Sequence, residues 1–313
     1  MVWFQDSYVR LGDANVNILT HGLNYGTGVF EGIRGGYNEE ERELYLIRVR
    51  EHYERWHGNC GIVGIKIPAD VEQLCEITAE LCRKNKFHSG VYVRPLAYKA
   101  SARIGVHADE NDAYAIVVVP FGDYFTGKRD FKAGVVTWRR VDDNAIPGRS
   151  KISGAYVNSV LAGGEARANG HDEAIFLTQD GHVAEGAASN IFMVRKGKLI
   201  TPPVTDNILE GITRDCVMEL ARRELGLEVI ERSIDRSELY ICDELFFCGT
   251  AVELISVTHI DHRLIKDGAP ATITPKLQRL YADATRGRMP AYRHWLRPVH
   301  AANKTEERHA LSV

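Results

Sequence analysis

The stretch from Phe121 to Asp130 divides the sequence, because it combines two glycines with mixed charge and shows no hydrophobic period. Short strand patterns and a few amphipathic helices lie on either side, without a strict strand–helix–strand repeat. A chain of 313 residues is long enough for two ordinary domains. We therefore predict an α+β fold with a small N-terminal domain over residues 1–122, an interdomain loop over 123–130, a larger domain over 131–297 and a mobile tail over 298–313.

The composition excludes several classes of protein. A net charge of −3 gives no basis for non-specific nucleic-acid binding, and no apolar run reaches membrane-spanning length. The N-terminus lacks the cationic segment and apolar core of a signal peptide, so we expect a cytoplasmic protein. The six cysteines form no CxxC pair and show no metal-ligand spacing. We expect them to be reduced and buried, and we predict no metal site.

Hydrophobic periodicity predicts two helices in the N-terminal part. The first begins near Val49 and buries one apolar stripe, which consists of Val49, Tyr53, Trp56, Cys60 and Val63. The second follows Pro68. A strand pattern over residues 91–96 comes next, and it places Tyr92 and Arg94 on the same side.

A lysine at the end of a Pro/Gly loop is the first candidate for chemistry. Lys151 follows Pro147 and Gly148 and precedes a helical pattern over residues 155–168, with Tyr156 little more than one turn downstream. A lysine amine can form a Schiff base with a carbonyl when its surroundings deprotonate it. The alternative is a solvated surface lysine, which is the commoner case. One face of the helix is apolar and consists of Val157, Val160, Leu161, Gly164 and Ala168.

Two glycine-containing segments are further candidates. Residues 21–36 hold six glycines with aromatic rings between them, which fits either a pocket wall or a glycine-rich turn without a ligand. Gly211 opens a helical pattern whose first backbone N–H groups form a potential anion site. The alternative for that segment is simply the start of a helix.

Six motifs in order over residues 3–295 identify a resemblance to the branched-chain aminotransferases, which belong to the class IV, fold-type IV family of pyridoxal-phosphate enzymes. The motifs are Tyr25-Gly-Thr-Gly-Val-Phe30-Glu31-Gly32-Ile33-Arg34, Tyr92-Val-Arg94-Pro95, Lys151 with Tyr156, Glu185-Gly-Ala-Ala-Ser-Asn190, Leu209-Glu-Gly-Ile-Thr-Arg214 and Cys248-Gly-Thr250-Ala251. The resemblance implies a small α/β domain followed by a larger domain with mixed, barrel-like β structure.

The resemblance implies pyridoxal 5'-phosphate as cofactor and assigns residues to it. Lys151 matches the lysine that carries the cofactor as a Schiff base and moves the proton. Glu185 matches the carboxylate that keeps the pyridine nitrogen protonated, and Tyr156 matches the phenol that hydrogen-bonds O3'. The residues that match the phosphate site are Arg55, Ile212, Thr213 and Thr250. Without the resemblance, Arg55 would be a solvent-directed arginine, Glu185 a surface charge and Tyr156 a core tyrosine.

The resemblance also implies transamination between L-branched-chain amino acids (leucine, isoleucine and valine) and 2-oxoglutarate, which gives branched-chain 2-oxo acids and L-glutamate by ping-pong kinetics. The apolar side-chain pocket would consist of Tyr25, Phe30, Gly32, Phe121 and Tyr124. Tyr92, Thr250 and Ala251 would receive the α-carboxylate, and Arg94 the distal carboxylate of 2-oxoglutarate or glutamate. Ile104, Gly105 and Val106 would reach the site from a neighbouring subunit, which implies a homodimer or a higher homo-oligomer.

Two charges depart from the family pattern, and three other functions stay open. Glu210 stands where proline is common, near the proposed phosphate site, and Arg149 adds a positive charge beside the lysine loop. The alternatives with the same cofactor are a D-amino-acid or (R)-amine transaminase and an aminodeoxychorismate-type lyase. A third possibility is a binding protein without catalysis, which the intact set of Lys151, Glu185 and Arg55 disfavours.

Overall fold

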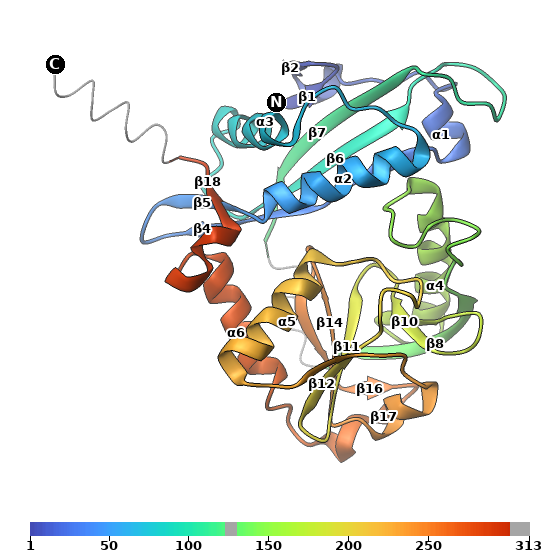
Figure 1. Cartoon of the computed structure of the whole chain (residues 1–313), viewed down its shortest axis with the longest axis vertical. Helices are drawn as coiled ribbons and strands as arrows, with labels where there is room; N and C mark the ends of the chain where they lie inside the picture. The colour runs from blue at the N-terminus through green and yellow to red at the C-terminus, as the bar shows by residue number, and fades with distance from the viewer. Residues whose placement is uncertain (123–129, 301–313) are drawn as a thin grey trace. The chain divides into compact units, whose positions relative to one another are not determined.

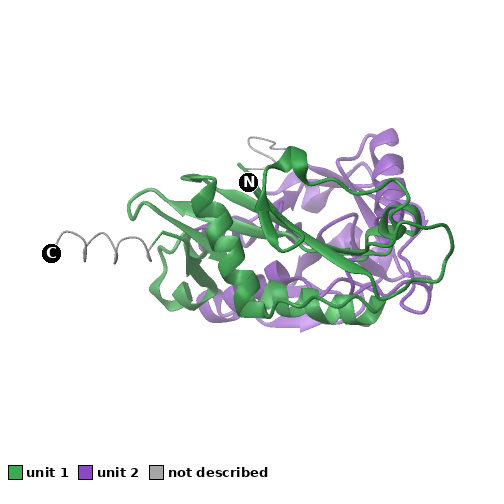
Figure 2. Cartoon of the chain, turned by 90° about the horizontal axis from the view of Figure 1, so that it is seen from above, with its two compact units in different colours: residues 1–122, 152–154, 283–313 green, residues 123–151, 155–282 purple. Residues whose placement is uncertain are grey.

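A computed structural model of the chain describes residues 1–122 and 130–300. Tyr124, one of the residues assigned to the substrate pocket, lies outside the described residues. The chain forms two compact units (Figure 2). The first unit comprises Met1–Gly122, Ile152–Gly154 and the chain from Asp283 onward, and the second comprises Asp123–Lys151 and Ala155–Ala282.

The first unit is built on an antiparallel sheet with the strand order β18-β5-β4-β6-β7-β1-β2, and β3 pairs with β6 beside this path (Figure 1). Its strands are β1 (Val2–Phe4), β2 (Ser7–Val9), β3 (Gly28–Phe30), β4 (Ile33–Asn38), β5 (Glu43–Ile47), β6 (Val91–Lys99), β7 (Asp112–Pro120) and β18 (Leu296–Pro298). Short 3-10 helices cover Leu11–Asp13 and Pro290–Trp295.

Two helices cover one face of this sheet, α2 (Val49–Val63) and α3 (Val71–Lys84), while α1 (His21–Tyr25) precedes β3. The expected stripe of α2 is confirmed at Val49, Tyr53, Trp56 and Cys60, which are all buried. The α3 helix begins with a capping box in which Asp70 and Gln73 bond each other's backbone N–H groups. The core therefore lies between these helices and the odd-numbered residues of β6, Val91, Val93 and Ala97.

The described part of the second unit forms two mixed five-stranded sheets, with the orders β10-β9-β8-β16-β17 and β13-β12-β11-β14-β15. The strands of the first sheet are β8 (Lys132–Arg139), β9 (Glu173–Leu177), β10 (Val183–Gly186), β16 (His259–Ile260) and β17 (Arg263–Leu264). Those of the second are β11 (Asn190–Arg195), β12 (Lys198–Thr201), β13 (Val229–Glu231), β14 (Glu244–Gly249) and β15 (Glu253–Val257).

Apolar side chains of both sheets share one core, to which Ile175 contributes from the first sheet and Phe247 from the second. Helix α4 (Tyr156–Ala168) packs on β8 and β9, and α5 (Ile212–Leu225) packs on β13 and β14. Helix α6 (Thr274–Thr285) follows, and 3-10 helices cover Ser153–Ala155, Arg236–Ile241 and Ile265–Gly268. The α+β class and the mixed β structure are confirmed, and neither sheet of the described residues closes on itself into a complete barrel.

Helix α4 turns its apolar face outward. Val157 is 62% exposed and Val160 is 69% exposed, while the buried positions are Ser159, Ala162 and Ala166. Small side chains allow a close approach of the helix to β8, whereas the large apolar residues of the amphipathic pattern remain on the surface of the single chain.

The end of the described chain packs with the first unit. Strand β18 pairs with β5, and Val299 is fully buried. The predicted ranges placed residues 283–297 in the larger domain and began a mobile tail at Pro298. The structure instead includes residues up to His300 in the first unit, because Glu43 accepts the backbone N–H groups of Val299 and His300.

All six cysteines are buried, as expected, and none of them is joined in a disulfide. Between residues 1 and 122 and between 130 and 300, no helix is long and apolar enough to cross a membrane.

Candidate active site

Lys151 and Tyr156 lie together at the start of α4. The Nζ of Lys151 is 3.2 Å from the phenolic oxygen of Tyr156, and both side chains are partly buried. The loop before the lysine packs tightly on residue 207, since a Cβ added to Gly148 would lie 2.5 Å from the carbonyl oxygen of Asn207. The loop–helix junction thus holds an amine and a phenol within hydrogen-bond distance.

Glu185 is a buried carboxylate with three donors around it. Arg140 Nη2 lies 2.9 Å from its Oε1, while the backbone N–H of Leu209 and the Nδ2 of Asn190 each donate to Oε2 over 3.1 Å. Asn190 also donates to the carbonyl of Leu209, so it joins the glutamate to the segment that enters α5. Gly211 must lack a side chain, because a Cβ there would lie 2.0 Å from Asn190 Oδ1.

Burial raises the pKa of Glu185, against the lowering effects of Arg140, of the Leu209 N–H and of Lys151. Arg140 received no role from the sequence. It follows a strand pattern 45 residues and several elements before the glutamate, so its position in the sequence does not indicate this pairing. Register shifts in β8 before Arg140 and in β10 before Gly186 redirect these side chains in a way that strand periodicity does not predict.

The N-terminus of α5 supplies the proposed anion site. Gly211 is its N-cap and makes no side-chain cap bond, so the first N–H groups include those of Ile212 and Thr213. The side chain of Thr213 is buried and hydrogen-bonds Tyr281, which leaves the backbone as the group that would face an anion. Thr250 and Ala251 lie in the turn between β14 and β15.

The two unusual charges near this loop neutralise each other. Arg149 Nη1 lies 3.1 Å from Glu210 Oε1, and both side chains are about half exposed. This pair removes the reason to expect repulsion between Glu210 and a bound phosphate.

In the first unit, Arg55 donates two hydrogen bonds to Glu31. Its Nε donates to Oε1 over 2.7 Å and its Nη2 to Oε2 over 2.8 Å, while His52 Nδ1 lies 3.0 Å from Oε2. The glutamate is fully buried; burial opposes its ionisation, but Arg55 and His52 hold its pKa well below the usual range. Sequence reasoning assigned Arg55 to a phosphate and missed Glu31 and His52, although Glu31 lies inside a quoted motif.

The first unit also brings together five residues assigned to substrate. Tyr92 and Arg94 share the face of β6 opposite to the helices, and Arg94 Nη2 donates to the Tyr92 oxygen over 3.0 Å. The guanidinium of Arg94 lies 4.5 Å from the ring centre of Phe30, and the Phe121 ring lies 5.2 Å from that of Tyr92. A Cβ at Gly32 would be 2.1 Å from the Tyr92 oxygen, so this position has no room for a side chain.

A second arginine, which the sequence interpretation left without a role, belongs to this cluster. Arg34 is paired in register with Tyr92, lies 5.1 Å from the ring centre of Phe121 and donates to the carbonyl of Gly122. Its position two residues after Gly32 puts it on the same face of the chain, which is the signal that was available.

Tyr25 lies with the loop over residues 104–106. Its phenolic oxygen accepts the backbone N–H of Gly105 over 2.8 Å. Ile104 and Val106 expose 73% and 74% of their surface, which is unusual for aliphatic residues. The sequence interpretation grouped Tyr25 with Phe30, whereas its described bond is to this loop.

Comparison with known proteins gives a match to the family model described as amino-transferase class IV, over residues 28–260. A protein of Aquifex aeolicus named "probable branched-chain-amino-acid aminotransferase" is 44% identical over 95% of this chain and 96% of its own. The branched-chain-amino-acid aminotransferase of Escherichia coli K12 is 36% identical over 90% of this chain and 91% of its own.

Solved structures agree in fold. A branched-chain aminotransferase from Thermoproteus uzoniensis with norvaline superposes with a TM-score of 0.91 at 42% identity, over 95% of this chain and 98% of that one. The branched-chain amino acid aminotransferase from Thermobaculum terrenum, solved in its PLP-form, also gives 0.91 at 39% identity, over 95% of this chain and 97% of that one.

Proposed function

Because the chain belongs to the class IV aminotransferases, we propose that it transfers the amino group between branched-chain L-amino acids and 2-oxoglutarate. The observation that carries the proposal is the pairing, in one unit, of Lys151 with Tyr156 and of Glu185 with Arg140. An amine next to a phenol and a buried carboxylate are the two polar anchors that a pyridine aldehyde requires.

The residues of the second unit fit pyridoxal 5'-phosphate. Glu185 is buried and held by three donors, so its carboxylate has a fixed direction and would bind a protonated pyridine nitrogen. The N–H groups at the start of α5 and the hydroxyl of Thr250 suit a phosphate. When bound, the cofactor supplies an electron sink for the carbanion at the amino acid Cα.

Lys151 is the proposed catalytic residue. With the cofactor bound, its amine would take the proton from the amino acid Cα and deliver it to the former aldehyde carbon of the cofactor. The phenol of Tyr156 orients that amine from 3.2 Å. Arg140 favours the ionised form of Glu185, because its charge lowers the pKa of the carboxyl against the raising effect of burial. Arg55 stays proposed as a phosphate ligand, with Glu31 fixing the direction of its guanidinium.

For the substrate, the aromatic rings of Phe30, Tyr92 and Phe121 offer an apolar surface for leucine, isoleucine and valine side chains. Arg94 is exposed on the same face and suits the distal carboxylate of 2-oxoglutarate. One surface can therefore take both partners of a ping-pong reaction, since Arg94 can turn toward solvent when the side chain is apolar.

The active form is proposed to be a homodimer or a higher homo-oligomer. Three exposed apolar residues of α4, Val157, Val160 and Leu161, form a patch typical of an interface between subunits. The exposed loop over residues 104–106 would reach the partner's site, and Tyr25 would accompany it because it bonds Gly105. The proposed compartment is the cytoplasm, where six free cysteines are expected to stay reduced.

A spectral half-reaction tests this function. Purified protein is loaded with cofactor and mixed in turn with L-leucine, L-glutamate, D-alanine and (R)-1-phenylethylamine, while the absorbance of the bound cofactor is followed. We expect conversion with the two L-amino acids, loss of conversion in Lys151→Ala and normal conversion in the control Lys198→Ala, whose lysine pairs with Glu228 on the surface. Conversion with D-alanine or the amine alone would move the function to a sister enzyme, and turnover without an amino acceptor would indicate a lyase.

A further inference from the structure

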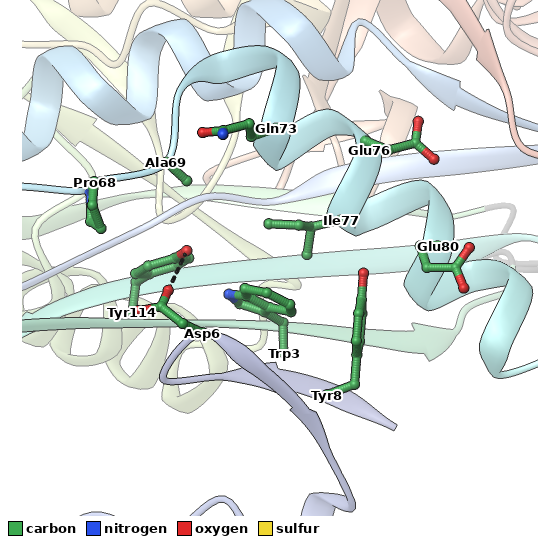
Figure 3. A pocket seen from close by; sticks show the side chains of 10 residues that line it. All are labelled: Trp3, Asp6, Tyr8, Pro68, Ala69, Gln73, Glu76, Ile77, Glu80 and Tyr114. Carbon is green, nitrogen blue, oxygen red and sulfur yellow. Dashed lines mark hydrogen bonds between the residues drawn. The ribbon is translucent and has the colours of Figure 1, made fainter.

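A pocket of about 570 Å³ lies in the first unit, between the β1–β2 hairpin, β7 and helix α3 (Figure 3). Three aromatic rings, those of Trp3, Tyr8 and Tyr114, line it from the strands. Asp6 lines it from the turn between β1 and β2, and helix α3 with the segment before it supplies the rest of the wall, which consists of Pro68, Ala69, Gln73, Glu76, Ile77 and Glu80. Its volume is in the range of small-molecule sites.

The sheet separates this pocket from the residues assigned to substrate. Tyr114 pairs with Ala97 in the β6–β7 register, and Trp3 pairs with Ile116, so both aromatic residues lie on the helix-covered face. Tyr92 and Arg94 occupy even positions of β6 and lie on the opposite face. The pocket is therefore a different place from the candidate active site.

The carboxylates that line the pocket differ in their partners. Glu76 is paired with Arg83 and Arg297, and Glu80 is paired with Arg83 and Lys84, so both are neutralised within the protein. Asp6 accepts a hydrogen bond from the Tyr114 phenol over 2.9 Å, and no ion pair joins it to a cation within residues 1–122 and 130–300. Figure 3 shows the Asp6 and Tyr114 side chains beside the Trp3 ring.

One aromatic ring of the pocket already contacts an ammonium group, that of Lys84. Lys84 Nζ lies 4.9 Å from the ring centre of Tyr8, a distance typical of a cation–π contact. Tyr8 and Trp3 are edge to face at 4.8 Å, so the aromatic surface continues from Lys84 toward Asp6. At the Asp6 end, the same aromatic chemistry stands beside a carboxylate that has no cation from the described chain.

We propose that this pocket binds a small organic cation, an ammonium compound with a short apolar arm. The charged head lies against Asp6 and the ring of Trp3, because a carboxylate and an indole face both attract a cation. The arm packs against Ile77 and Pro68, which are apolar lining residues. The proposal does not depend on the aminotransferase function, since it uses none of the residues assigned to that reaction.

Choline is the probe, and 3,3-dimethylbutan-1-ol is its uncharged match, with carbon in place of the nitrogen. A quaternary ammonium cannot condense with an aldehyde, so choline does not report on Lys151 chemistry. The chain has four tryptophans, and 5-fluorotryptophan labelling gives fluorine resonances among which Trp3→Phe identifies that of Trp3. We expect saturable movement of the Trp3 resonance by choline, and at least about fivefold weaker binding of the alcohol.

The substitution Asp6→Asn removes the charge and retains an acceptor for the Tyr114 hydroxyl. Asparagine also tolerates the left-handed backbone of this position, where φ is 60°. We expect choline binding to weaken at least about fivefold in this variant. Asp267→Asn is the matched control, an exposed aspartate at φ 54° in the second unit, and it should bind choline as the wild type does. Equal binding of choline and the alcohol, unchanged binding in Asp6→Asn, or no saturable shift of the Trp3 resonance would each overturn the proposal.

Discussion

Arg140 donates to Glu185 over 2.9 Å, and the two side chains are only 10% and 7% exposed. A buried pair of this kind is costly to break, because removing one partner leaves the other charge without compensation. The pair also connects β10 to the residue that directly follows β8, so it fixes the carboxylate relative to the sheet that carries it.

We expect Arg140→Met to raise the pKa of Glu185 further above its usual range, since burial then acts without the opposing cation. A carboxyl with a raised folded-state pKa contributes stability below its unfolded pKa of about 4.3, and this contribution is lost as the pH rises through the folded value. The variant should lose about 3 kcal/mol of unfolding free energy near pH 7, and the deficit should shrink toward pH 5. Urea unfolding of the cofactor-free protein at both pH values measures this.

The double variant Arg140→Met/Glu185→Gln is the control for that experiment. It removes both charges and should recover most of the lost stability at neutral pH. A deficit that stays the same at every pH, or a double variant as unstable as the single one, would contradict the assignment of the effect to charge.

Glu31→Gln should have the opposite pH dependence. The pKa of Glu31 is depressed, so its ionic contribution is present above the unfolded value of about 4.3 and is lost as the pH falls toward the folded value. We expect the variant to be about 3 kcal/mol less stable than the wild type at pH 7, because Arg55 loses its counter-charge and His52 loses a carboxylate partner. The difference should narrow below pH 4 in chemical unfolding, and a constant difference down to pH 3 would argue against the ion pair as its source.

The variant Arg94→Gln tests whether Arg94 binds the distal carboxylate of 2-oxoglutarate while the aromatic rings bind the apolar side chain of leucine. The loss of a charge-assisted contact to the distal carboxylate should lower kcat/KM for 2-oxoglutarate by about 10- to 100-fold and leave that for L-leucine within a few-fold. Arg222→Gln, at an exposed position of α5, is the matched control and should change neither value. An equal loss for both substrates would mean that Arg94 supports the Phe30 and Tyr92 rings rather than the carboxylate.

Subunit mixing tests the proposal that the protein is a homodimer in which Tyr25 acts across the subunit interface. Lys151→Ala and Tyr25→Ala homodimers should both be weak, whereas their heterodimer should hold one intact site, with Lys151 from one chain and Tyr25 from the other. Activity of the mixture should therefore rise well above that of either parent after dissociation and reassociation. Activity no higher than the average of the parents would place Tyr25 in the site of its own subunit.

Val160→Glu tests the exposed face of α4. A charge in the centre of the proposed apolar interface should shift the protein toward monomer in sedimentation and lower its activity, since loop 104–106 would no longer reach a partner. Leu264→Glu changes a residue of similar exposure, 52%, outside that face and should leave the oligomer intact. An unchanged sedimentation coefficient in Val160→Glu would exclude this face as the interface.

Hydrophobic periodicity predicted the elements whose buried face follows from the local sequence alone. The stripe of α2 from Val49 to Cys60 is buried as expected, because a helix repeats its inner face every three or four residues whatever its partner. The same reasoning found α4 but gave no indication that its face at Val160 stays uncovered in the single chain. Pattern alone distinguishes apolar from polar, and it does not distinguish a core from an interface.

Contacts between distant segments were the part that could not be predicted. Lys151 and Tyr156, by contrast, are only five residues apart across the turn that leads into α4, and the structure places them at hydrogen-bond distance. Arg140 reaches Glu185 only because β8 and β10 flank β9 in one sheet, with irregular register on both sides. The pairing of Arg55 with Glu31 similarly depends on where α2 crosses the sheet.

Strand β18 has a consequence for synthesis of the chain on the ribosome. The sheet of the first unit contains β5 at Glu43–Ile47 and its neighbour β18 at Leu296–Pro298, while Val299 completes its core. The first 122 residues therefore emerge long before the strand that closes their edge, and the segments of the second unit are translated in between. The first unit is therefore complete only after residues 296–299 have emerged, so a chain truncated shortly before Leu296 would lack an edge strand of its first unit.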